Sequence, residues 1–279
     1  MNKLIIAVLL ISLAANSYSQ TTNNIYEVYA VPFAKVKSYM QAKAFAINPV
    51  VPDSAKVIFM TWLLKGNNGR IVLVDAGLQR KSKYFNDQIT DFVRPDSSLA
   101  GMGIKAADIT DIIITHPHFD HIGGLELFPN ARCWMQKKDY SYFVTDAWQK
   151  GGNSGGFDST DVPVLAGLNA AGRLQLVDGD SIEIIPGIRV YIGSRHTYES
   201  QFVVVNTSTD KVLIASDNCW YYYNLDHLIS IPFTLDAVGY VNSLKRMKTL
   251  VKPELIIPGH DSKIFDRFTK VKDGIVKIR

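Results

Sequence analysis

The chain has 279 residues, of which 47% are hydrophobic and 20% are charged, a composition typical of a globular protein that can bury a sizeable core. The formal net charge of +4 is small and no basic run occurs, which argues against nucleic-acid binding and membrane-surface binding. Two cysteines, Cys133 and Cys219, are too few for a disulfide scaffold, and the sequence leaves their pairing open.

The first residues have the pattern of an export signal. One lysine precedes an apolar stretch over 4–15, and Ser17 and Ser19 suit the −3 and −1 positions of a signal-peptidase site. About twelve apolar residues are too few to span a bilayer. We therefore expect a signal peptide over 1–19 and a periplasmic or secreted mature chain over 20–279, with no stable membrane insertion after signal removal.

The first half of the mature chain alternates strand and helix patterns. Apolar strand patterns cover 25–31, 56–65 and 70–77, and the "GNNG" segment between the last two predicts a hairpin turn. Helical patterns follow over 84–92 and 104–109. The run "DIIITH", which starts at residue 111, is typical of a buried strand that ends at a histidine.

The second half predicts a short helix over 124–130, a strand over 131–136, a longer helix over 137–149 and a loop over 150–167. Two hairpins follow over 173–193 and 200–217, and the chain ends with a helix over 236–250 and a last strand over 254–261. The Gly-, Ser- and Pro-rich loop is expected to be a mobile cover. Hairpins with helices kept apart from them indicate an α+β domain in which two sheets pack face to face and helices cover the outside.

Metal-ligand residues gather where these strands end. "THPHFDH" holds His116, His118, Asp120 and His121 within six positions, directly after an apolar strand. Further single residues end three later strands, namely His196, Asp217 and His260. Three imidazoles so close together would repel when protonated and would lose hydrogen bonds when buried, unless a cation binds their lone pairs. Neutral imidazole and carboxylate groups suit zinc and related divalent ions.

The pattern H-x-H-x-D-H, followed by a single His, Asp and His, resembles the metallo-β-lactamase superfamily of metal-dependent hydrolases. The resemblance extends over nearly the whole mature chain and implies an αβ/βα sandwich of two mixed sheets with a two-metal site at one edge. It implies that one metal is held by His116, His118 and His196 and the other by Asp120, His121 and His260. Asp217 would bridge the two metals, and Asp75 would orient a ligand histidine.

Such a site performs hydrolysis. Two divalent ions about 3.5–4 Å apart can share a water, lower its pKa and present hydroxide to a carbonyl carbon. The resemblance favours zinc and leaves manganese, iron and cobalt open.

Asp217 argues against a true β-lactamase, because those members lack the bridging aspartate. The chain looks most like the N-acyl homoserine lactonase-like group, which implies a small-molecule lactone or carboxylic ester as substrate. A glyoxalase II-like thioesterase and a β-lactamase are the alternatives, and a non-catalytic metal-binding protein is a further one.

The residues beside the motif indicate an apolar pocket. Phe119 lies inside the motif and Trp220 follows Asp217 by three positions, where the lactonase-like group tends to carry a tyrosine. Tyr221 is therefore the candidate donor to the reacting carbonyl, and Asp120, Asp217 and Tyr221 are the candidate catalytic residues. The segment around His196 also departs from the group's pattern, since it reads "GSRHTYES".

Overall fold

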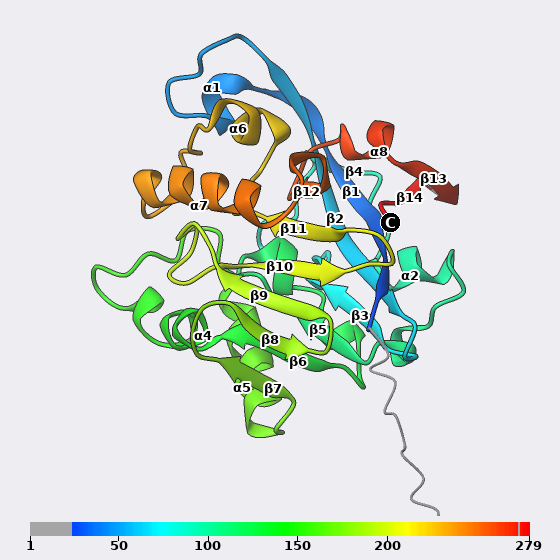
Figure 1. Ribbon diagram of the computed structural model, residues 1–279. Coiled ribbons are helices and arrows are strands. Elements are labelled where there is room, and N and C mark those ends of the chain that lie inside the picture. The colour runs from blue at the N-terminus through cyan, green and yellow to red at the C-terminus, as the bar shows by residue number, and fades with distance from the viewer. Residues whose placement is uncertain (1–23, 273) are drawn as a thin grey trace, which may run out of the picture.

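The computed structural model describes residues 24–272 and 274–279, which fold into two β-sheets flanked by helices (Figure 1). The predicted signal peptide over 1–19 lies outside the described residues. In the described part of the chain, helices fall short of the length and apolar character that a membrane span needs.

The larger sheet is mixed. Its strands, in spatial order, are β13 (Thr269–Lys272), β14 (Ile275–Lys277), β1 (Tyr26–Gln41), β2 (Ser54–Gly66), β3 (Ile71–Val74), β5 (Asp111–Ile113), β6 (Arg132–Gln136) and β7 (Leu174–Val177), with β4 (Ile89–Thr90) paired to β1. From β3 to β7 the strands run parallel.

The smaller sheet has five strands, of which only the β11–β12 pair is parallel. Their order is β12 (Ile256–Pro258), β11 (Lys211–Ser216), β10 (Gln201–Asn206), β9 (Ile188–Ile192) and β8 (Ile182–Ile185).

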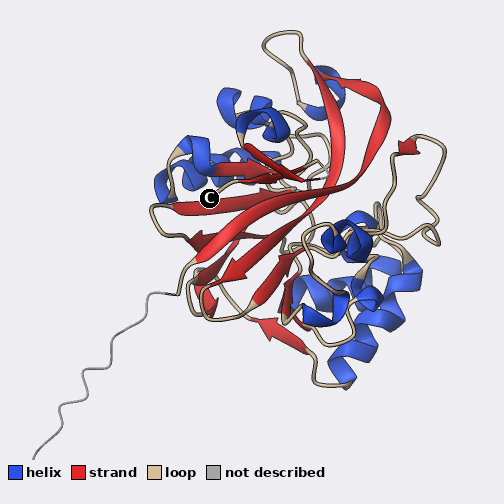
Figure 2. Cartoon of the chain, turned by 90° about the vertical axis from the view of Figure 1, so that its right-hand side faces the viewer, coloured by secondary structure: helices blue, strands red, loops and turns tan. Residues whose placement is uncertain are grey.

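The helices lie on the outer sides of the two sheets, so that in Figure 2 the strands stand between helices on either side. The α-helices are α1 (Ala42–Phe45), α2 (Pro95–Ala100), α3 (Phe119–Ile122), α4 (Lys137–Val144), α5 (Val162–Ala170), α6 (Tyr222–His227), α7 (Ala237–Leu250) and α8 (Ile264–Arg267). Single 3-10 turns cover Ala106–Asp108, Leu125–Leu127, Asp146–Trp148, Ser159–Asp161 and Pro253–Leu255.

The two-residue alternation of β2 explains the layering. Trp62 and Leu64 face the smaller sheet, where they join a buried cluster with Val203 and Ile214. Leu63 points to the opposite face and joins a second cluster under the helices that cover the larger sheet. All three of these β2 side chains are fully buried, so both faces of the strand lie in a core. The predicted α+β sandwich of two face-packed sheets is therefore confirmed.

Several local predictions are wrong in detail. The expected helix over 84–92 is a turn followed by β4, because the Asn86 side chain accepts the Gln88 N–H and so offers the backbone an alternative to a helix. The expected loop over 150–167 ends early, since α5 begins at Val162 with a proline in its first turn. The expected hairpin over 173–193 is divided, because β7 joins the larger sheet while β8 and β9 pair in the smaller one.

The two cysteines are free and buried. Cys133 lies in the core beneath the helices of the larger sheet, whereas Cys219 lies in the other large core cluster, which includes residues of both sheets and of α7.

Candidate metal centre

The predicted ligands meet at one edge of the sandwich, where strands of both sheets end. His116 and His118 follow β5, and α3 then carries Asp120 and His121 in its first turn. The smaller sheet contributes the other three residues from the loop after β9 and the ends of β11 and β12, namely His196, Asp217 and His260. Strand ends hold side chains at fixed positions while the loops beyond them stay open to a substrate.

The first group of ligand atoms surrounds one point. His118 Nδ1 lies 3.0 Å from both His116 Nε2 and His196 Nε2. Asp217 Oδ2 completes the group at 3.1 Å from His196 Nε2 and 3.8 Å from His116 Nε2. A tetrahedral ion with bonds of about 2.0–2.1 Å keeps its ligand atoms about 3.3–3.4 Å apart. These separations therefore suit a divalent cation.

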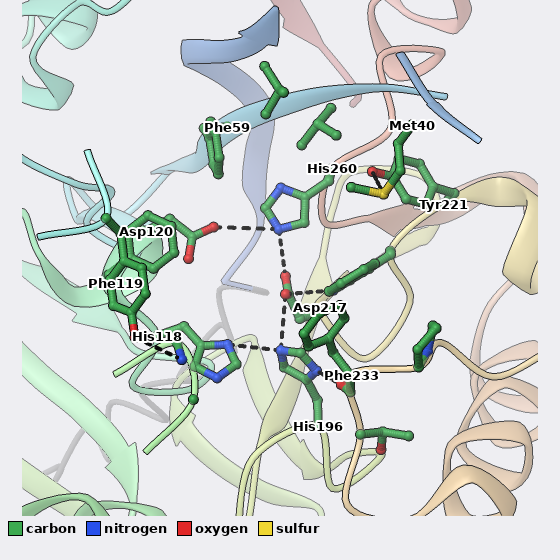
Figure 3. A pocket seen from close by; sticks show the side chains of 18 of the residues that line it. Met40, Phe59, His118, Phe119, Asp120, His196, Asp217, Tyr221, Phe233 and His260 are labelled. Atoms are coloured by element: carbon green, nitrogen blue, oxygen red, sulfur yellow. Dashed lines mark hydrogen bonds and ion pairs between the residues drawn. The ribbon is translucent and has the colours of Figure 1, made fainter. Parts of the chain in front are cut away.

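The second group uses the other oxygen of the same carboxylate. Asp217 Oδ1 lies 3.0 Å from His260 Nε2 and 3.3 Å from His121 Nε2. Asp120 Oδ2 lies 3.3 Å from His121 Nε2 and 3.6 Å from His260 Nε2. Figure 3 shows Asp217 between His196 and His260, with one oxygen toward each. Asp217 therefore lies between the two groups of ligand atoms, and its role as a bridge between two ions stays a prediction.

The outer nitrogens of three histidines are held by acceptors of the chain itself. His196 Nδ1 donates to the Phe233 carbonyl oxygen at 2.6 Å, and His260 Nδ1 donates to the Ile58 carbonyl oxygen at 3.0 Å. His121 Nδ1 donates to Asp75 Oδ2 at 2.8 Å. A proton on Nδ1 leaves Nε2 with a free lone pair, so these contacts aim three lone pairs at the centre.

Asp75 is the hub behind the site and is fully buried. Besides His121, it accepts the Thr115 N–H at 2.8 Å, the Thr115 hydroxyl at 2.9 Å and the Ser216 hydroxyl at 3.0 Å. Thr115 directly precedes His116, and Ser216 directly precedes Asp217. One carboxylate therefore ties β3, β5 and β11 together beneath the ligands. Sequence analysis predicts Asp75 but misses Thr115 and Ser216. The signal that could have found them is a short polar residue directly before a ligand.

The electrostatics of the cluster also fit a cation. His121 Nε2 and Asp217 Oδ1 are buried and have no hydrogen-bond partner among the described residues, which is costly unless an ion binds there. Burial disfavours a charged His121, but Asp120, Asp217 and Asp75 outweigh burial and hold its pKa well above the usual value. On the other side, burial and then the neighbouring His196 lower the pKa of His118 to about 3. The cluster thus has neutral imidazoles on one side and surplus negative charge on the other.

The ligands form the floor of a cavity of about 520 Å³. Its walls are mostly apolar and aromatic, and include Met40, Phe59, Phe119, Trp220 and Phe233. Among the residues that the structure describes, no lysine or arginine lines it. A cavity of this kind favours an uncharged ligand with an apolar part.

The structure separates the roles of the predicted pocket residues. Phe119 lies over the ligands and stacks on Tyr84, with ring centroids 4.6 Å apart. Tyr221 lines the cavity, but its hydroxyl is directed at Met40 Sδ, 4.0 Å away, as Figure 3 shows. Its role as a donor to the reacting carbonyl stays a prediction. The sequence gives no indication of Tyr84, whose hydroxyl accepts the Gly156 N–H at 3.1 Å and so ties the glycine-rich loop to the cavity wall.

Known proteins share the sequence pattern and the fold. The sequence model of the Metallo-beta-lactamase superfamily matches residues 60–260. An N-acyl homoserine lactonase of Bacillus thuringiensis is 27% identical over 218 residues, which are 72% of this chain and 80% of that protein.

Solved structures agree with this match at the level of the fold. An N-acyl homoserine lactone hydrolase with its product N-hexanoyl-L-homoserine at the catalytic metal centre superposes with a TM-score of 0.66 at 22% identity, over 88% of this chain and 97% of that one. AidC, a dizinc quorum-quenching lactonase, gives a TM-score of 0.61 at 17% identity, over 92% of this chain and 97% of that one. Together with the match over 60–260, these findings show that the chain is a metal-dependent hydrolase that belongs to the metallo-beta-lactamase superfamily.

Proposed function

We propose that the chain hydrolyses lactones or simple carboxylic esters with an apolar substituent, and that it does so with two divalent ions, zinc in the first place. The observation that carries the proposal is Asp217, whose two oxygens face two separate groups of ligand atoms. The relatives named N-acyl homoserine lactonases support the choice of lactones.

The chemistry divides between the ions and the chain. Two ions held by these residues would acidify a water and polarise the substrate carbonyl. The Nδ1–H groups of His121, His196 and His260 are engaged by Asp75 and by backbone carbonyls, which leaves the Nε2 lone pair of each ring for an ion. Asp120 lines the cavity, so its carboxylate can accept the proton of the attacking water and return it to the departing alkoxide.

The cavity wall supports a neutral substrate. An anionic thioester of the glyoxalase II type carries its charge away from the reacting carbonyl, and the described lining residues offer no lysine or arginine to offset that charge. An ester also suits the site because its alkoxide leaves without the strong proton donor that an amide nitrogen needs. A lactone is therefore favoured over a β-lactam as the substrate.

A substrate panel tests the proposal. Zinc-loaded protein is compared by kcat/KM on acyl homoserine lactones, plain γ- and δ-lactones, thioesters, a penicillin and a carbapenem, with Asp217→Asn as the control for contaminating activity. We expect lactones to be preferred. A tenfold preference for a β-lactam, about 1.4 kcal/mol in transition-state stabilisation, would overturn the choice. A tenfold preference for a thioester would support the glyoxalase II-like alternative, and metal binding without any turnover would support the non-catalytic one.

Metal stoichiometry is a separate test of the two-ion site. Elemental analysis after loading with zinc should give two equivalents per chain. A reproducible single equivalent, with no gain in activity from added metal, would contradict the proposal.

We also propose that the chain is exported, on the strength of the apolar stretch over 4–15 and the small residues after it. Amino-terminal sequencing of the protein from a host with a periplasm should give a mature chain that starts at Gln20. An intact Met1 in the cytoplasmic fraction would contradict export.

A further inference from the structure

Trp220 makes a contact that the predicted ligand set does not include. Its indole N–H donates to Asp217 Oδ2 at 2.7 Å. Its ring meets the imidazoles of His196 and His260 edge-on, with centroids 5.9 and 6.2 Å away, and it stacks on Phe233 at 5.7 Å. Trp220 lies beside Asp217 at the wall of the cavity. Trp220 thus touches one oxygen of the shared carboxylate and both groups of ligands.

The backbone around Trp220 keeps the indole in place. The Trp220 N–H donates to the Tyr240 hydroxyl at 3.1 Å, and the Trp220 carbonyl accepts the His260 N–H at the same distance. The Tyr240 hydroxyl in turn donates to the Asp217 carbonyl at 3.3 Å. Asp217, Trp220 and His260 therefore form one hydrogen-bonded unit across β11, β12 and α7. These backbone bonds keep the indole N–H directed at Asp217.

An aspartate that serves two groups of ligands needs such a restraint. The last torsion of an aspartate is soft, so the carboxylate can rotate about its Cβ–Cγ bond at little cost. Oδ1 accepts no hydrogen bond from the described residues, whereas Oδ2 accepts the indole N–H, so this bond is a direct restraint on the rotation. Rotation would turn both oxygens out of line with His196 and His260 together.

We propose that Trp220 is a positioning residue that holds the Asp217 carboxylate in the orientation that spans both groups of ligands. The inference rests on the two-ion site proposed above, and it gives the residue at position 220 a role through its N–H as well as through its ring. Loss of a hydrogen bond behind a metal ligand typically lowers metal affinity by about 10–100-fold. One carboxylate serves both ions. Loss of the indole hydrogen bond should therefore weaken binding of the second equivalent of metal more than binding of the first.

Trp220→Phe tests the proposal, because it removes the N–H and keeps an aromatic ring for Phe233. The chain offers a matched control in Trp134, whose indole N–H donates to Asp111 Oδ1 at 3.0 Å, away from the ligands. Zinc affinities of both variants are measured by competition with a chelator. We expect Trp220→Phe to bind its second equivalent at least tenfold more weakly than wild type, and Trp134→Phe to bind both equivalents as wild type does. Wild-type affinity for both equivalents in Trp220→Phe would overturn the proposal.

Two spectroscopic readouts separate positioning from a general loss of structure. Cobalt-loaded Trp220→Phe should show a changed visible spectrum, because the shared carboxylate no longer has a fixed orientation. Zinc binding should change the tryptophan emission of Trp134→Phe, because this variant keeps Trp220. In Trp220→Phe most of this change in emission should be lost. An unchanged cobalt spectrum, or a full emission response without Trp220, would contradict the proposal.

Metal-free unfolding in urea completes the design. Zinc raises the free energy of unfolding of the protein, and we expect this increase to be smaller in Trp220→Phe than in wild type. The decrease should be larger than any difference in free energy of unfolding between the two metal-free proteins. The reverse would show a purely structural role and would overturn the proposal. None of these measurements needs a substrate, so a failed substrate panel leaves the role of Trp220 standing.

Discussion

Substitution of Asp75 by asparagine is the sharpest test of how the buried hub controls the site. The two side chains have nearly the same shape, so the change removes charge and one acceptor without opening a cavity. Asp75 Oδ1 accepts the Thr115 N–H, while Oδ2 accepts His121 Nδ1–H and the hydroxyls of Thr115 and Ser216. An asparagine must place its NH2 group at one of these two positions.

Either placement creates a conflict. An NH2 group at the Oδ1 position meets the Thr115 N–H, which cannot turn away. At the Oδ2 position it meets His121 Nδ1–H, and relief there requires the proton to move to Nε2, which removes the lone pair that faces Asp120 and Asp217. A hydrogen bond to a charged group contributes about 1.5–3 kcal/mol, and an unpaired buried donor costs about 1–3 kcal/mol. Added together, these contributions lead us to expect that Asp75→Asn lowers the free energy of unfolding by about 2.5–6 kcal/mol and metal affinity by about 10–100-fold.

The assay is urea unfolding of the metal-free protein together with chelator competition on the zinc-loaded protein. Asp111→Asn is the matched control, since Asp111 is also buried and accepts from Arg70, Thr110 and Trp134 at the opposite end of β5. The control should lose stability and keep wild-type zinc affinity. Equal zinc affinity in the two variants would refute the reasoning, because the loss would then come from stability alone and not from the His121 proton.

Three further predictions follow from the same geometry. Asp217→Ala should bind at most one equivalent of zinc by elemental analysis and lose more than about 100-fold in turnover, since one carboxylate serves both groups; two retained equivalents would contradict the bridge. Gly156→Ala should weaken zinc binding in chelator competition, because the new Cβ would lie 2.7 Å from His118 Cδ2. The control is Gly151→Ala, which has a similar positive φ and open space around it and should change only the stability of the chain. Burial raises the pKa of Asp161 to about 7, so the folded chain keeps a proton that the unfolded chain releases, and this contribution to stability is lost as pH rises from about 4 to 7. Asp161→Asn should flatten the fall of the urea midpoint over that range, and an unchanged pH profile would contradict this reading.

The ligand set is predictable from sequence because it is local and is placed by strand ends. His116, His118 and His121 are separated by only a few residues, and β11 and β12 are apolar runs that stop at Asp217 and just before His260. The two-sheet architecture follows from the same alternation of apolar strands and amphipathic segments.

What sequence reasoning misses depends on tertiary contacts. β1 continues to Gln41, well beyond the predicted 25–31, because β2 and β4 pair with it there. The acceptors that fix His196 and His260 are backbone carbonyls of Phe233 and Ile58, which any residue type would supply. The direction of the Tyr221 hydroxyl is likewise set by packing, since its ring lies 4.6 Å from that of Phe45, far away in the sequence.

The ligand groups draw on both sheets, and this has a consequence for the stability of the whole chain. His116 and His118 come from the larger sheet, whereas His196, Asp217 and His260 come from the smaller one. An ion held by both sets acts as a crosslink between the two halves of the sandwich. The unfolded chain has no preformed site, so the binding free energy adds to the free energy of folding and grows with the logarithm of free metal concentration. At about a hundred times the dissociation constant, one such ion contributes about 2.7 kcal/mol. Scarcity of metal would therefore loosen the contact between the sheets as well as stop turnover, and proteolytic lifetime would follow the supply of metal.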